Sequence, residues 1–135
     1  MKKIFLGLLA AAIFLSQSKL GSAQEHWHDL GDDEEYVADY ILDPGDSKTV
    51  TIYSEKEVQI GFKTNATGEQ INKYKKDKSH KVSFIQDQTG KGMIGVSSAG
   101  ESTFSPIDEK IVITLSNTTN ETFKMIVYRT PKTTR

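Results

Sequence analysis

The sequence predicts an all-β protein: a single antiparallel β-sandwich, immunoglobulin-like or jelly-roll, that follows a cleaved signal peptide. Three observations lead to this prediction. The chain begins with a sequence typical of export, later segments alternate apolar and polar residues, and turn-forming residues separate those segments. Because the chain contains no cysteine, the exported domain has to be stabilised by burial alone, without disulfides.

The first 23 residues have the order of a secretory signal peptide. Lys2 and Lys3 supply positive charge, residues 4–15 are apolar, and Gly21 and Ala23 are small residues at the positions that signal peptidase requires. The apolar run is shorter than the roughly 20 residues of a membrane-spanning helix, which disfavours the alternative of an uncleaved anchor. We therefore expect cleavage after Ala23, a secreted mature chain without a transmembrane segment, and a bacterial source.

The strand predictions rest on apolar residues that recur with a period of two, since successive side chains of a strand point to opposite faces. Six segments show this pattern: TVTIY at 49–53, EVQIGFK at 57–63, HKVSFIQ at 80–86, GMIGVS at 92–97, KIVITLS at 110–116 and TFKMIVYR at 122–129. The segment YVADYIL at 36–42 is a candidate for a further, first strand. The inward positions predict a core of Val50, Ile52, Val58, Ile60, Phe62, Val82, Phe84, Ile111, Ile113, Leu115, Phe123 and Val127.

Turn-forming residues lie between the predicted strands. Asp43-Pro44-Gly45-Asp46 is a turn sequence, because proline presets one backbone dihedral and glycine accepts a positive one. Residues 68–78 are polar and predict a loop or a short surface helix, and no substantial helix is expected elsewhere in the mature domain. The predicted organisation is a signal peptide at 1–23, an acidic leader at 24–46, a sandwich body at 47–130 and a frayed tail at 131–135.

Charge is distributed unevenly along the mature chain. Residues 25–46 of the acidic leader contain nine acidic side chains and no lysine or arginine, whereas residues 47–135 carry a net charge of +5. The densest positive segment, here called the lysine cluster, comprises Lys73, Tyr74, Lys75, Lys76, Lys78, His80 and Lys81. Concentrated positive charge attracts polyanions, and an aromatic ring among the lysines would offer a stacking face. The lysine cluster is therefore the predicted polyanion-binding site, and a hydrated loop is the alternative.

The stretch EHWHD at residues 25–29 is a candidate metal site. Cleavage after Ala23 would place His26 third in the mature chain, where a free amine, two peptide nitrogens and the imidazole suit Cu(II) or Ni(II). His28 and Asp29 could add donors, while a disordered terminus is the alternative reading. The acids at 32–35, with Asp43 and Asp46, are of the type that binds Ca²⁺, although their spacing matches no known calcium loop. No other cofactor is expected.

Three catalytic or cofactor motifs are excluded by their context or their sequence. Residues 90–95 match the G-x-G-x-x-G fingerprint, but they open a β-patterned segment rather than a helix, so the glycines are expected to serve a hairpin turn and a bulge. The segment at 95–99 lacks the closing glycine of a nucleophile elbow, and no H-E-x-x-H is present. Asp108 and Glu109 are expected to alternate across a strand and so not to converge. The protein is therefore not expected to be an enzyme.

These features lead to two functional hypotheses. The first is a secreted, non-catalytic binding module directed at the cell envelope or an extracellular polyanionic polymer, with no specific recognition of nucleic acid. The alternative is an extracellular interaction or inhibitor protein that acts on a partner enzyme through its sandwich loops. We also expect residues 25–35 to fold over the lysine cluster, held by Trp27, because nine uncompensated acids need a positive surface nearby.

Overall fold

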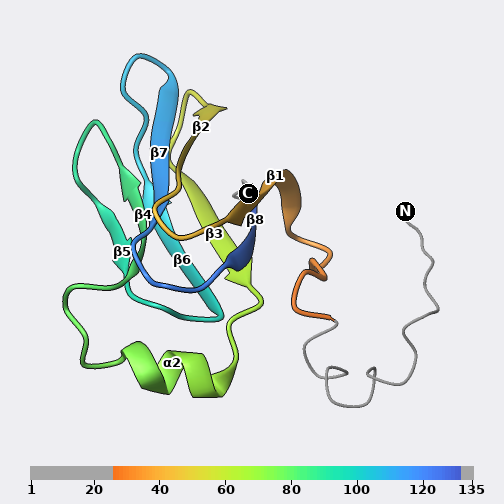
Figure 1. Ribbon diagram of the computed structural model, residues 1–135. Coiled ribbons are helices and arrows are strands. Elements are labelled where there is room, and N and C mark those ends of the chain that lie inside the picture. Colours follow the sequence, from red (N-terminus) through yellow and green to blue (C-terminus); the bar gives the residue numbers. More distant parts are fainter. Residues whose placement is uncertain (1–25, 132–135) are drawn as a thin grey trace.

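Eight antiparallel strands and one short helix make up residues 26–131, the part of the chain that the computed structural model describes (Figure 1). The predicted signal peptide and residues 24, 25 and 132–135 lie outside the described residues. The elements are β1 (Glu35–Leu42), β2 (Ser47–Tyr53), β3 (Val58–Thr64), α2 (Gly68–Tyr74), β4 (Val82–Gln86), β5 (Gly92–Ile94), β6 (Ala99–Phe104), β7 (Lys110–Asn117) and β8 (Phe123–Thr130).

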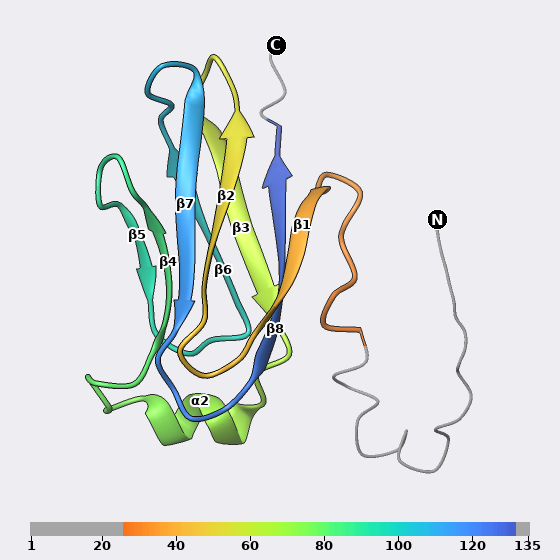
Figure 2. The ribbon, with the colours of Figure 1, turned by 45° about the horizontal axis from the view of Figure 1, so that its top comes forward.

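The strands form two four-stranded sheets, in the orders β1-β8-β3-β6 and β2-β7-β4-β5. Among consecutive strands only β4 and β5 share a sheet, and every other connection passes from one sheet to the other (Figure 2). Eight strands that alternate in this way between two sheets are consistent with the predicted antiparallel sandwich. The all-β prediction is therefore confirmed, and the first strand, uncertain from sequence, is present as β1.

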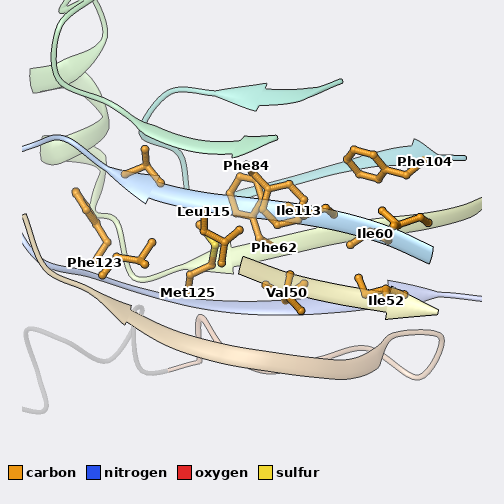
Figure 3. Packing of buried hydrophobic residues seen from close by; sticks show 14 of the residues in the cluster. Val50, Ile52, Ile60, Phe62, Phe84, Phe104, Ile113, Leu115, Phe123 and Met125 are labelled. Atoms are coloured by element: carbon orange, nitrogen blue, oxygen red, sulfur yellow. The ribbon is translucent and has the colours of Figure 1, made fainter. Parts of the chain in front are cut away.

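The core lies between the two sheets and is formed by the inward residues that the alternation predicts (Figure 3). All twelve predicted core residues are buried, and Ile60, Ile111, Ile113, Leu115 and Val127 have no exposed surface at all. Aromatic rings connect the sheets: the centroids of Phe62 and Phe84 are 5.0 Å apart, and those of Phe84 and Phe104 are 6.2 Å apart. Burial of the inner face of each sheet thus stabilises a domain that has no disulfide.

The helix α2 covers the end of the sandwich at which β3 ends and β4 begins (Figure 1). Its first turn is fixed by a capping box, in which Gln70 N donates to Thr67 Oγ1 and Thr67 N donates to Gln70 Oε1. The short surface helix predicted in residues 68–78 is therefore confirmed for residues 68–74. No helix within the described residues is long and apolar enough to cross a membrane.

The glycines at 90–95 serve a hairpin, as predicted. Gly90 has a φ of 81° in the turn between β4 and β5, a conformation that glycine adopts without a steric penalty. Gly95 has a φ of 135° immediately after β5, so the strand predicted at 92–97 ends at Ile94. Because no helix follows these glycines, the dinucleotide fingerprint is excluded by the fold itself.

Asp108 and Glu109 do not alternate across a strand, which corrects the sequence prediction. They are the two central residues of a tight turn before β7, with φ values of 57° and 65°. Ile107 N donates to Lys110 O at 2.9 Å, and Lys110 N donates back to Ile107 O at 3.3 Å. Two successive positive φ angles characterise a type I′ turn, which asparagine and glycine tolerate far better than aspartate and glutamate do.

Replacing Asp108 and Glu109 by Asn and Gly should therefore raise the free energy of unfolding by about 1–2 kcal/mol, because left-handed backbone strain is relieved. Urea denaturation of the double variant would measure this change. Glu55→Gly is the control, since this exposed loop residue has no positive φ and gains nothing from glycine. An equal stabilisation in the control would contradict the assignment of strain to the turn.

Truncation of Ile113, which is fully buried in the central strand β7, should lower the free energy of unfolding by roughly 2–5 kcal/mol. The cost comprises the lost transfer free energy of the side chain and the cavity that it leaves. Denaturation of Ile113→Ala would test it, with exposed Thr51→Ala on β2 as a control expected to change stability by less than about half a kcal/mol. A similarly small effect at Ile113 would show that the core was assigned wrongly.

Candidate functional site

The lysine cluster lies on the last turn of α2 and on the connection that leads to β4 (Figure 1). Lys73, Lys75, Lys76 and Lys78 are exposed, while His80 and Lys81 are half-buried. The charges are therefore presented at one end of the sandwich, next to the helix.

Glu121, in the loop between β7 and β8, fastens α2 to the sandwich. Its carboxylate accepts hydrogen bonds from Gln70 Nε2 at 2.7 Å, Tyr74 Oη at 2.7 Å and Lys73 Nζ at 3.0 Å. These bonds, from Gln70, Tyr74 and Lys73 in that order of effect, lower the pKa of Glu121 from its ordinary value of 4.5 to about 2. One ionised side chain thus adds three hydrogen bonds to the packing of Tyr74 and Ile71 that holds this helix on the sandwich.

Tyr74 does not provide the stacking face that the sequence suggested. Its side chain is buried, with 7% of its surface exposed, and its hydroxyl is bonded to Glu121. The Lys73 ammonium lies 5.2 Å from the centroid of the Tyr74 ring while it pairs with Glu121. Tyr74 and Lys73 therefore belong to the anchor of α2, and the sequence offered no sign of this because Glu121 lies far along the chain.

The connection after α2 is ordered by local bonds. Asp77 accepts hydrogen bonds from the backbone of Ser79 and His80 and from the His80 ring, at 2.8–3.0 Å, and these contacts lower its pKa. Lys81 Nζ donates to the Lys78 carbonyl at 3.1 Å. These bonds fix the backbone from which the remaining lysines project.

Lys75, Lys76 and Lys78 are the exposed cations of the lysine cluster that no carboxylate neutralises. Within residues 26–131, the ion pairs of lysine and arginine with carboxylates involve only Lys63, Lys73 and Arg129. A hollow of about 420 Å³ beside α2 is lined in part by Lys75, Ile71 and Val96, at the edge of this surface. The three ammonium groups and this hollow form the candidate anion-binding surface.

The acidic leader does not fold over the lysine cluster, which corrects the docking hypothesis. Lys63 on β3 donates to Glu34 Oε1 at 2.8 Å and to the Asp29 carbonyl at 2.7 Å. Arg129 on β8 pairs with Glu35 at 3.1 Å. Both views place residues 26–34 beside β1, apart from the connection that follows α2 (Figures 1 and 2). Glu34 and Glu35 are therefore each paired with one cation of the sheet that contains β1, β8 and β3.

The predicted metal residues lie together on the exposed surface. His26 Nδ1 is 3.1 Å from Asp29 Oδ2, and His28 Nε2 is 3.9 Å from Asp29 Oδ1. In residues 26–131 no three histidine, aspartate or glutamate side chains converge on a common metal position. The nitrogens of residues 24 and 25, which the Cu(II) or Ni(II) hypothesis requires, lie outside the described residues, so that hypothesis stays a prediction. Of the candidate calcium ligands, Glu34 and Glu35 are engaged by Lys63 and Arg129.

Comparison with known proteins adds little to this description. No protein family matches the sequence, and no curated protein is similar to it. Among solved structures, the chain is similar to the solution structure of a de novo designed double-stranded β-helix. The two share 10% sequence identity with a TM-score of 0.44, over 71% of this chain and 96% of that one. The class of protein that can be stated is therefore an all-β protein with two four-stranded antiparallel sheets.

The Glu121 anchor predicts a specific dependence of stability on pH. Because the pKa of Glu121 is lower in the folded state, its stabilisation is present above the unfolded value of 4.5 and is lost as the pH falls towards about 2. We expect wild type to be more stable than Glu121→Gln at neutral pH, with the difference shrinking between pH 4.5 and about 2. Urea denaturation across this pH range measures the difference.

The matched control for this experiment is Glu55→Gln, a change of the same charge at an exposed glutamate in the β2–β3 loop. A difference between wild type and Glu121→Gln that stays constant from neutral pH to pH 2 would contradict the anchoring role of the carboxylate. So would the same pH profile in the control variant.

Proposed function

We propose that this protein is a secreted, non-catalytic binding module for a polyanionic polymer of the cell envelope or extracellular space. The observation that carries the proposal is the group Lys75, Lys76 and Lys78: three exposed ammonium groups, close in sequence, without a carboxylate partner in residues 26–131. Teichoic acids, acidic polysaccharides and shed DNA are polymers of the required charge. The electrostatic attraction of the lysines to such polymers is long-ranged and does not depend on the order of units in the polymer.

The rigidity of the supporting backbone favours binding. The capping box, the Glu121 anchor and the Asp77 turn hold α2 and its following connection in place before any ligand arrives. Only the lysine side chains lose conformational freedom on binding, so little of the interaction free energy is spent on ordering the loop. The ion pair between Lys73 and Glu121 leaves Lys73 as a positioning residue and Lys75, Lys76 and Lys78 as the contacts.

The alternative proposal, a protein that acts on an extracellular partner enzyme, is favoured by a different surface. Tyr53 and Ile107 are 73% and 42% exposed, and both residues are cross-strand neighbours of Lys110, at the start of β7. Exposed aromatic and aliphatic side chains of this kind are enriched at protein interfaces. Tyr53 is the last residue of β2 and Ile107 lies in the β6–β7 loop, so this surface adjoins the loops through which the alternative expects binding.

Binding to heparin, used as a model polyanion, distinguishes the two proposals. The double variant Lys75→Gln/Lys76→Gln should bind more weakly than wild type. The slope of log affinity against log salt should also fall by roughly 1–2, since each anion contact contributes about 0.7–0.9 to the slope with nucleic acids. Titrations at two or more salt concentrations measure both quantities.

The matched control is Lys56→Gln/Lys110→Gln, which removes the same charge from exposed lysines outside the lysine cluster. An equal loss of affinity in both double variants would show that only net charge matters. Salt-insensitive or undetectable binding of heparin by wild type would reject the polyanion proposal and leave the interaction protein as the better one.

A further inference from the structure

A groove of about 610 Å³ lies beside β1, between the acidic leader and the sandwich. Its volume is within the roughly 300–1,000 Å³ typical of small-molecule sites. Trp27 from the leader, Ile41 from β1 and Met125 from β8 give the groove its apolar lining. Trp27 is half-buried and Ile41 is 57% exposed, so a flat apolar surface remains accessible to a ligand.

The groove is lined by β1, the outermost strand of its sheet, and by the neighbouring strand β8. Tyr40 is paired with Met125 and Ile41 with Lys124 in the ladder between β1 and β8. Since neighbouring residues of a strand point to opposite faces, the lining comes from both faces of the sheet. A ligand that contacts side chains on both faces therefore has to be elongated.

Two cations line the groove. Lys48 comes from β2 and Lys124 from β8, and both side chains are exposed. Neither takes part in the ion pairs formed within residues 26–131, which use Lys63, Lys73 and Arg129. These two cations favour a ligand that carries one or more negative charges.

Two polar side chains complete the lining, the carboxylate of Asp39 and the hydroxyl of Tyr40. Asp39 Oδ1 already accepts a hydrogen bond from Tyr36 Oη at 2.8 Å, and its second oxygen can accept from a ligand hydroxyl. Burial, together with the nearby Asp39 charge, raises the pKa of Tyr40, so its hydroxyl stays a neutral donor. A ligand suited to these groups has hydroxyls as well as anionic groups.

We infer that the groove between Trp27 and β1 binds a short stretch of an acidic polysaccharide. A sugar ring has one face of C–H bonds that can pack on the Trp27 indole, hydroxyls that match Asp39 and Tyr40, and an acid group for Lys48 or Lys124. An aromatic carboxylate would satisfy the ring and the lysines but not the hydrogen-bonding side chains. The inference goes beyond the proposed function, because it assigns a second site, separate from the lysine cluster, and names the chemistry of the polymer that this site binds.

The test uses the intrinsic fluorescence of Trp27, which is the only tryptophan of the chain. Titration with a galacturonic acid trisaccharide should change the fluorescence in a saturable way. The neutral galactose trisaccharide and benzoate should each bind at least about tenfold more weakly, since each lacks one class of contact. Equal binding of the neutral trisaccharide would overturn the inference, as would the absence of any response to the acidic one.

Variants locate the binding. Lys48→Gln/Lys124→Gln should weaken binding of the acidic trisaccharide by about tenfold or more, whereas the matched control Lys56→Gln/Lys110→Gln should not. Trp27→Ala, followed by calorimetry, should weaken binding to a similar extent. Far-ultraviolet circular dichroism verifies that each variant is folded. Unchanged affinity in Lys48→Gln/Lys124→Gln would reject the groove as the site.

The same measurements separate this inference from the proposed function. Lys75→Gln/Lys76→Gln should bind the trisaccharide as wild type does while it loses affinity for heparin. Heparin binding that depends on Lys75 and Lys76, without a Trp27 response to the trisaccharide, would remove the groove and keep the proposed function. A Trp27 fluorescence response that depends on Lys48 and Lys124, without heparin binding, would keep the groove as a binding site and reject the proposed function of the lysine cluster.

Discussion

One end of this sandwich depends on the hydrogen bonds of the Asn117 side-chain amide. It is fully buried at the end of β7, and all its hydrogen-bonding capacity is used. Its Nδ2 donates to the carbonyls of Leu42 and Glu121 at 2.8 and 2.7 Å, and its Oδ1 accepts from Thr119 N and Oγ1 at 2.9 and 2.7 Å. Its backbone bonds the turn at 43–46. One amide therefore joins the end of β1 to the loop before β8, and a partner lost here would leave a buried polar group unsatisfied.

This bond network also determines the candidate functional site. The carbonyl of Glu121 accepts a hydrogen bond from Asn117 Nδ2, which fixes the backbone of Glu121. The Glu121 carboxylate is thereby positioned to bind Gln70 and Tyr74 of α2. The lysines that follow the helix are displayed from a framework that begins in the core. The charge of the surface is a property of local sequence, but its position is a consequence of contacts between residues about 50 positions apart.

Features that depend on strand periodicity could be predicted from the sequence. Features that depend on a contact between residues far apart in the chain could not. All twelve core positions predicted from alternation are buried, but Leu42, Phe104 and Met125 also belong to the core and were not predicted. The strand β6, with the sequence AGESTF, shows hardly any apolar residue before Phe104 and was missed. The burial of Tyr74 and the pairing of the leader with Lys63 were also not predicted. The net charge of the leader indicated that its acidic residues need cations nearby. The two cations that pair with them, Lys63 and Arg129, cannot be told apart in the sequence from any other exposed lysine or arginine.

The pairing of the first and last strands has a mechanical consequence. In the β1–β8 ladder, Glu35 at the start of β1 lies opposite Arg129 near the end of β8. A pulling force applied between these two points acts across the ladder, so the hydrogen bonds are loaded one after another rather than all together. After the Lys63–Glu34 pair opens, β1 can peel from the sheet beginning at Glu35, while β3 and β6 remain paired. Under tension between these two points, the sheet is therefore expected to lose its edge strand first and its inner strands later.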